Sequence, residues 1–173
     1  MWAHVESADY SKACAGVAVS DSPVGPFVYQ GSFRPNNAMS RDQTVFVDDD
    51  GRAYQFYSSE NNETMYISLL TDDYLKPSGR FTRNFVKESR EAPAVFKYNG
   101  KYYFSYSTGD THLLCYATGD NPYGPFTYQG VILTPVVGWT THHAIVEFKG
   151  KWYLFHHDCV PSCLLYTSPS PRD

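Results

Sequence analysis

Two carboxylic acids, Asp42 and Glu91, occur in similar segments, "SRDQTVFVDDDGRAYQFY" and "SREAPAVFKYNGKYYFSY". Each acid stands nine residues before a glycine, Gly51 or Gly100. Two carboxyl groups in one narrow site cannot both ionise cheaply, so the pKa of one of them rises and it keeps its proton near neutral pH. A protonated carboxyl group of this kind is suited to protonating the leaving oxygen when a glycosidic bond is cleaved.

The glycines that follow these acids mark a repeat. Gly51, Gly100 and Gly150 stand at intervals of 49 and 50 residues. Each follows a short apolar run and precedes an aromatic-rich one, with Asp, Asn or Lys in the turn, which predicts a β-hairpin. A second marker, "SDSPVGPFVYQG", returns as "GDNPYGPFTYQG" 99 residues later, which is two periods. Hairpins repeated every fifty residues or so, with no convincing amphipathic helix, are typical of the four-stranded blades of an all-β propeller.

A propeller gives a reason for the paired acids. Equivalent positions on successive blades point to equivalent places, so Asp42 and Glu91 are expected at one end of the central channel. Counting back nine residues from the third glycine gives Thr141, with His142 and His143 next. Neighbouring residues on a strand face opposite sides, so we expect only one of the two histidines to join the acids.

Simpler interpretations exist for the repeat and for the acids. An all-β sandwich could repeat its hairpins by chance, although sandwiches rarely keep so constant a period. Asp42 and Glu91 could merely pair with Arg41 and Arg90 or cap turns, and His142 could be an ordinary hydrogen-bonded core histidine. A propeller can also act as a binding module without catalysis, and such a module needs no acids at the mouth of the channel.

The composition excludes two classes of partner. The 173 residues suffice for one domain with a core, and the 17% of aromatic residues favours strands. The net charge of −4 argues against nucleic acids, whose binding depends on clustered Lys and Arg. No apolar run is long enough to cross a bilayer, so no membrane partner is expected. The four cysteines form no CxxC motif, and Cys14 and Cys115 are expected to be buried thiols.

The repeat amounts to about three blades, which do not close a ring, because propellers typically need about four to eight. We therefore expect residues 1–162 to be a partial propeller from a longer protein. The remaining segment, "CLLYTSPSPRD", shares neither the period nor the composition of the rest and resembles a translated sequencing adapter. Residues 163–173 are accordingly expected to be a non-native tail.

Three segments together resemble glycoside hydrolase family 43: "SRDQTVFVDDDGRAY", "REAPAVFKYNGKYYFSYS" and "GWTTHHAIVEFKGKWYLFHHD". The resemblance implies a five-bladed propeller that hydrolyses glycosidic bonds with inversion, using an Asp base, a Glu acid and a second Asp that tunes the acid. By motif, Glu91 matches the general acid and Asp42 the tuning Asp. His142 matches the histidine near a calcium ion in the channel. The base of the family lies upstream of Met1, so this chain alone is expected to be inactive.

The resemblance also implies a carbohydrate substrate, a plant-type polysaccharide or oligosaccharide with arabinose, xylose or galactose linkages. The first half of the chain is closer to branches acting on β-1,3-galactan, and the second half to β-xylosidase and α-L-arabinofuranosidase branches. The residues expected to bind the sugar are Arg41, Arg90, Trp139 and His143. Trp2 and Tyr106 could also stack on a sugar, although aromatic residues in strands more often belong to the core. For His156 and His157 a structural role is the better interpretation.

Overall fold

The computed structural model describes residues 1–136 and 142–158. Within these ranges the chain has thirteen strands and one short 3₁₀ turn, Pro35–Asn37, so the prediction of an all-β fold is confirmed. The described part of the chain contains no long apolar helix of the kind that spans a bilayer. Two compact units, Met1–Phe85 and Val86–Asp173, divide the chain, and each is described by itself.

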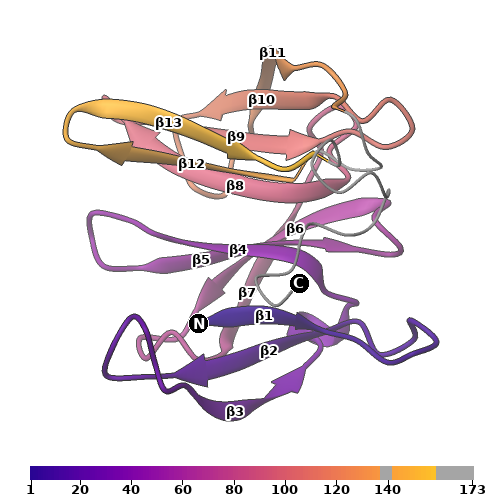
Figure 1. Ribbon diagram of the computed structural model, residues 1–173, viewed down its shortest axis with the longest axis vertical. Helices are drawn as coiled ribbons and strands as arrows, with labels where there is room; N and C mark the ends of the chain where they lie inside the picture. Colours follow the sequence, from indigo (N-terminus) through magenta and orange to yellow (C-terminus); the bar gives the residue numbers. More distant parts are fainter. Residues whose placement is uncertain (137–141, 159–173) are drawn as a thin grey trace, which may run out of the picture. The chain divides into compact units, whose positions relative to one another are not determined.

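The first unit contains a three-stranded and a four-stranded antiparallel sheet (Figure 1). Their strand orders are β1–β2–β3 and β4–β5–β6–β7, so every strand pairs with its neighbour in the sequence. The strands are β1 Trp2–Val5, β2 Cys14–Val19, β3 Val28–Phe33, β4 Arg41–Val47, β5 Ala53–Ser59, β6 Thr64–Leu70 and β7 Pro77–Asn84. The turn Pro35–Asn37 lies between β3 and β4 and links the two sheets.

The second unit contains a four-stranded sheet of order β11–β10–β9–β8 and a two-stranded sheet, β12–β13 (Figure 1). The strands are β8 Glu91–Tyr98, β9 Lys101–Ser107, β10 Leu114–Gly119, β11 Thr127–Leu133, β12 His143–Phe148 and β13 Lys151–His156. A meander of four antiparallel strands is the blade predicted from the repeat. The sheets β4–β7 and β8–β11 confirm that prediction.

The glycines that mark the repeat occupy the hairpin turns, as predicted. Gly51, Gly100 and Gly150 have φ angles of 79°, 76° and 77°, in the left-handed region that glycine adopts without steric cost. A methyl group added at any of them would meet no atom within 4 Å, so a side chain would fit in the space. Glycine is favoured at these positions by the backbone conformation alone. The second marker also recurs in the structure, with cis peptide bonds at Gly25–Pro26 and Gly124–Pro125.

The core of each unit lies on a central strand of its four-stranded sheet. All seven residues of β5 are buried, and Phe56 and Tyr57 are 0% exposed. In β9, Phe104 and Tyr106 are also 0% exposed, and their stacked ring centroids are 5.1 Å apart. The buried hydroxyl of Tyr57 accepts a hydrogen bond from the side-chain amide of Asn36 at 3.2 Å, so this polar group is not left unsatisfied.

The two described cysteines differ in burial. Cys115 is 2% exposed, and burial raises the pKa of its thiol, so the prediction of a buried thiol is confirmed there. Cys14 is only half-buried, and the prediction of a buried thiol is wrong for this residue. It opens β2 directly after the β1–β2 loop, where its thiol donates to the Lys12 carbonyl at 3.3 Å.

Ile67 offers a test of the core of the first unit. Its side chain is 0% exposed in β6, so Ile67→Ala removes buried methyl groups and leaves a cavity. In the complete protein that contains this chain, we expect the free energy of unfolding to fall by about 2–5 kcal/mol in urea denaturation. Val24→Ala is the control, because Val24 is 91% exposed and its truncation should change stability little. Equal losses in the two variants would contradict the assigned core.

Candidate active site

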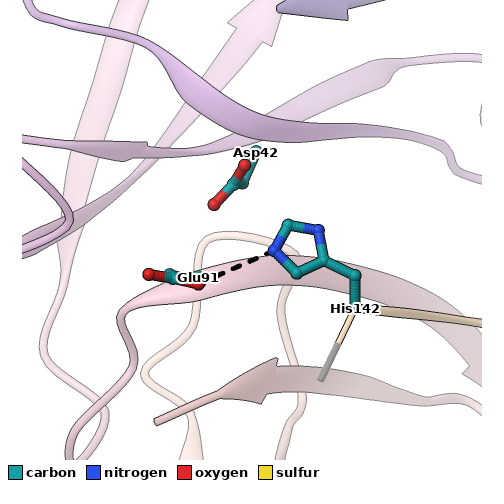
Figure 2. A group of neighbouring side chains, drawn as sticks. All are labelled: Asp42, Glu91 and His142. Atoms are coloured by element: carbon teal, nitrogen blue, oxygen red, sulfur yellow. Dashed lines mark ion pairs between the residues drawn. The ribbon is translucent and has the colours of Figure 1, made fainter. Parts of the chain in front are cut away.

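Glu91 begins strand β8 and lies next to His142, the residue before β12. Oε2 of Glu91 and Nε2 of His142 are 3.6 Å apart, which is an ion pair when the imidazole is protonated (Figure 2). The Glu91 side chain is 21% exposed and the His142 side chain 39% exposed. A carboxyl group that is partly enclosed, beside an imidazole and still accessible, can exchange a proton with a bound molecule.

His142 and His143 have different partners, as expected for neighbouring residues. The Nε2 atom of His143 lies 2.7 Å from the hydroxyl of Ser105, which is 1% exposed on the central strand β9. This hydrogen bond ties β12 to the sheet β8–β11. The ring of His142 instead lies 5.6 Å from the ring of His157, whose backbone N–H donates to the His142 carbonyl. Within the second unit, His142 is therefore the histidine beside Glu91.

A β-bulge occurs at each of the two predicted acids. In β4 the bulge lies between the pairs Arg41–Ser58 and Thr44–Phe56. In β8 the bulge lies between the pairs Glu91–Ser107 and Ala94–Ser105. In each case three steps along one strand match two steps along its partner. Inside the bulges, Asp42 has φ 43° and Ala92 has φ 48°. A non-glycine residue in this left-handed region costs about 1–3 kcal/mol, and such residues concentrate at functional sites.

The bulges show that the two acids do not share one register position. Counted from the bulge, Glu91 is equivalent to Arg41, and Asp42 is equivalent to Ala92. The glycine intervals miss this offset because the hairpin after β4 is one residue longer than the hairpin after β8. The prediction of an acid at the same position in both blades is therefore wrong, and the acids occupy adjacent positions of the repeat.

His142 has the register position of Asp42. The pairing of β12 with β13 places Ala144 at the position that Ala94 has in β8. His142 stands two residues before Ala144, as Ala92 stands before Ala94. Successive blades thus carry an acid, an alanine and a histidine at one position, and Glu91 stands one residue ahead of it.

The guanidinium group of Arg41 makes three hydrogen bonds within the first unit. Its Nε donates to the Glu6 carboxylate at 3.4 Å, Nη1 to the Asn61 side chain at 3.0 Å and Nη2 to the Tyr10 carbonyl at 2.7 Å. The Arg41 side chain is 14% exposed. These contacts connect the start of β4 to the β1–β2 loop, and binding of sugar by Arg41 stays a prediction.

Glu6, in the β1–β2 loop, is a residue that the sequence analysis missed. Its carboxylate accepts hydrogen bonds from the backbone N–H groups of Ala13 and Ser7 and from the side chains of His4 and Arg41. Burial raises the pKa of Glu6, but these hydrogen bonds outweigh burial and lower the pKa to about 2. A single Glu in "HVESADYSKA" has no distinguishing pattern, and only the neighbouring Ser and Asp residues indicate a structured turn.

Tyr106 is a core residue, whereas Trp2 is half-buried. The indole N–H of Trp2 donates to the Tyr74 carbonyl at 3.1 Å. Tyr106 is 0% exposed, and its hydroxyl donates to the Lys87 carbonyl at 2.7 Å. The core interpretation is thus confirmed for Tyr106, while Trp2 packs edge-to-face against Phe33 without being fully buried. Trp139, another aromatic candidate, lies outside the described residues.

The remaining candidates lie in the second unit. Arg90 is half-buried just before β8, and its backbone N–H donates to the Ser107 carbonyl at 3.2 Å. A methyl group at Gly109 would lie 3.5 Å from Cγ of Arg90, so the aliphatic part of Arg90 runs along this glycine. His156 and His157, at the end of β13 and just after it, are both exposed. A structural role for these two histidines stays a prediction.

Comparison with known proteins identifies the family. A profile described as glycosyl hydrolases family 43 matches residues 2–168. The chain belongs to this family. A "Xylosidase/arabinosidase" of Bacteroides ovatus is 51% identical, with 85% of this chain and 57% of the relative covered. The fold is accordingly an all-β propeller built of four-stranded antiparallel blades.

Solved structures of the family are similar throughout most of the chain. A family 43 β-xylosidase/α-arabinofuranosidase from a compost microbial metagenome, in complex with xylotriose in a calcium-free form, is 41% identical with a TM-score of 0.75. The alignment covers 87% of this chain and 58% of that structure. A Xanthomonas citri family enzyme complexed with xylotriose is 36% identical with a TM-score of 0.82, covering 92% and 59%. The chain thus spans somewhat more than half the length of its relatives.

The low pKa of Glu6 predicts a pH dependence of stability. Its folded pKa of about 2 lies below the ordinary value of 4.5, so ionised Glu6 stabilises the fold above pH 4.5, and this contribution is lost as the pH falls towards 2. In the complete protein, Glu6→Gln should lower the melting temperature at neutral pH and weaken its pH dependence between pH 4.5 and 2.

The measurement is the melting temperature of the wild type and Glu6→Gln across this pH range. Asp21→Asn is the control, because Asp21 is an exposed carboxylate in a turn of the same unit and its replacement should keep the wild-type profile. Identical pH profiles for the wild type and Glu6→Gln would show that the Glu6 hydrogen bonds do not stabilise the folded state.

Proposed function

We propose that the complete protein containing this chain is an inverting glycoside hydrolase that cleaves xylose or arabinose linkages in plant-type polysaccharides or oligosaccharides. One observation carries the proposal: in a chain of family 43, Glu91 opens β8 as a half-buried carboxyl group beside His142. The relative named as a xylosidase/arabinosidase and the structures complexed with xylotriose support the substrate class.

Glu91 is the proposed general acid. It donates its proton to the glycosidic oxygen while the bond from that oxygen to the anomeric carbon breaks. A base activates a water molecule that attacks the opposite face of the sugar, which requires about 6.5–9.5 Å between acid and base. The family pattern puts the base upstream of Met1, so this chain contributes the acid half of the reaction and is proposed to be inactive by itself.

Asp42 is the proposed partner of Glu91. A second carboxylate near the acid disfavours ionisation of the acid, so Glu91 would still hold its proton when the substrate arrives. The support is the family motif and the bulge that begins directly after Glu91 in β8 and at Asp42 in β4. The register offset does not oppose this role, because a bulge can re-aim a side chain.

Arg90, His143 and Trp139 are the proposed sugar-binding residues of this chain. The half-buried Arg90 lies directly before Glu91 and carries hydrogen-bond donors that suit sugar hydroxyl groups. His143 has the least support of the three, because its Nε2 contacts Ser105 and its Nδ1 is buried. The hydrogen bonds of Arg41 favour a positioning role within the first unit.

Calcium is proposed as the metal of the channel, with His142 close to it. Calcium takes about 6–8 oxygen ligands, whereas His142 offers an imidazole nitrogen that lies beside the Glu91 carboxylate. This donor set therefore suits a hydrated calcium ion, with water molecules between the ion and His142. It suits an ion bound directly to the imidazole ring less well. Such an ion would supply positive charge at the site, and His142 would orient its water shell.

Replacing the acid tests the function. Glu91→Gln keeps the shape of the side chain but removes the proton, so turnover of an unactivated xylo- or arabino-oligosaccharide should fall by about 10²–10⁴-fold in the complete protein. The loss should be much smaller for a nitrophenyl glycoside, whose leaving group needs little protonation. The measurement is kcat for both substrates, with product anomers followed by NMR.

Glu88→Gln is the matched control, because it makes the same change at an exposed position three residues away and should keep wild-type turnover. Wild-type hydrolysis of the unactivated substrate by Glu91→Gln would rule out Glu91 as the acid. Sugar binding without hydrolysis by the complete wild-type protein would instead favour a binding module.

Calcium binding can be tested without an activity assay. We expect calcium to raise the melting temperature of the complete protein and EDTA to reverse the change, because an ion that binds only the folded state stabilises it. The shift should shrink in His142→Ala and remain in His156→Ala, which changes an exposed histidine of β13. Magnesium, which prefers a smaller octahedral site, is the ion control. An unchanged melting temperature with calcium would contradict the proposed metal.

A further inference from the structure

Asp42 lies between two residues whose side chains are both tied to the neighbouring sheet of the first unit. Arg41, before it, donates to Glu6 in the β1–β2 loop. Gln43, after it, donates through Nε2 to the Ala3 carbonyl of β1. The backbone of Asp42 is therefore held from both sides by contacts to residues about forty positions earlier in the chain.

The side chain of Gln43 is fixed by buried partners. Its Oε1 accepts hydrogen bonds from the Gln55 amide and from the Ser40 hydroxyl. Gln55 and Ser40 are both 0% exposed, so this arrangement lies inside the first unit. A buried amide must keep its hydrogen bonds, because a lost partner leaves a desolvated polar group unsatisfied.

The β1–β2 loop connects the two sides. Glu6 accepts from the backbone N–H of Ala13 at 2.8 Å, and the Ala13 carbonyl accepts from the backbone N–H of Ser40 at 2.8 Å. Arg41 also reaches the loop through the Tyr10 carbonyl. The loop and the segment 40–43 thus form one hydrogen-bonded arrangement, with Asp42 inside the segment.

The equivalent bulge in β8 contains a proline. Pro93 stands at the position of Gln43, after Ala92, and is buried. Proline fixes its own φ angle without long-range partners, but it favours an extended residue before it, so Pro93 does not account for the left-handed Ala92. In β4 no proline is present, and the left-handed conformation of Asp42 depends on side-chain hydrogen bonds. A strained residue persists only where its surroundings over-determine it.

We propose that Arg41 and Gln43 are positioning residues that fix the carboxyl group of Asp42, with Glu6 and Gln55 as their anchors. This inference rests on the proposed role of Asp42 as the partner of the general acid. It assigns Arg41 to the architecture of the site and not to the sugar. It also makes the β1–β2 loop part of the catalytic apparatus, although no residue of that loop needs to touch substrate.

The test uses Arg41→Met and Gln43→Met in the complete protein. Methionine has the length of glutamine and retains much of the aliphatic part of arginine, but it makes none of their polar contacts. A misplaced Asp42 impairs acid catalysis, so kcat for an unactivated oligosaccharide should fall by about 10–100-fold. The loss should be several-fold smaller for a nitrophenyl glycoside, and KM should change little. A general loss of folded protein would lower both activities equally.

Arg83→Met is the matched control. Arg83 lies in the same sheet and donates to Thr64 at 2.6 Å, but it lies in β7 and not at the bulge. It should change the two activities by the same small factor. If Arg41→Met fails to fold, Gln43→Met carries the same comparison.

Asp42→Asn completes a double-mutant cycle with each Met variant. If Arg41 and Gln43 act through Asp42, the double variants should be no slower than Asp42→Asn alone. Losses that multiply would overturn the positioning role and leave the proposed function intact. An Asp42→Asn variant with wild-type turnover would instead reject the role of Asp42 itself, and the inference with it.

Discussion

A β-bulge with a left-handed residue opens the first strand of both four-stranded sheets, and the placement of the candidate acids depends on it. In an unbroken strand, neighbouring side chains point to opposite faces. The extra residue of a bulge interrupts this alternation and can turn a side chain that would otherwise face away. In β8 the acid, Glu91, directly precedes the bulge, and in β4 the acid, Asp42, is the first residue inside it. The same kind of β-bulge therefore occurs at the start of two strands that carry different acids, Asp42 and Glu91.

Two carboxylates that form ion pairs, Glu6 and Glu91, have opposite roles. Glu6 is surrounded by donors that lower its pKa to about 2, so it stays ionised at neutral pH and cannot supply a proton. Its value is structural, because it holds Arg41 and the β1–β2 loop together. Glu91 begins a strand beside His142 and remains accessible. That contrast supports Glu91, and not Glu6, as the acid of the proposed reaction.

The parts of the fold that sequence predicts well are local ones. A turn glycine and its flanking apolar residues define a hairpin within a dozen residues, so Gly51, Gly100 and Gly150 identified the blades. The register was not predictable from these glycines, because a hairpin one residue longer leaves the glycine spacing almost unchanged while shifting the acid. Contacts such as Glu6 with Arg41, 35 residues apart, follow from the pairing of neighbouring sheets and have no sequence pattern.

Gln43 and Pro93 constrain the backbone of their strands in different ways. Proline fixes its own φ angle by covalent geometry, without hydrogen bonds to other strands. Glutamine works only through Ala3, Gln55 and Ser40, so the conformation of Asp42 depends on the sheet β1–β3 and on β5. Changes in the β1–β2 loop would therefore reach Asp42. On the proposed mechanism, such changes adjust the strength of the acid through its partner carboxylate.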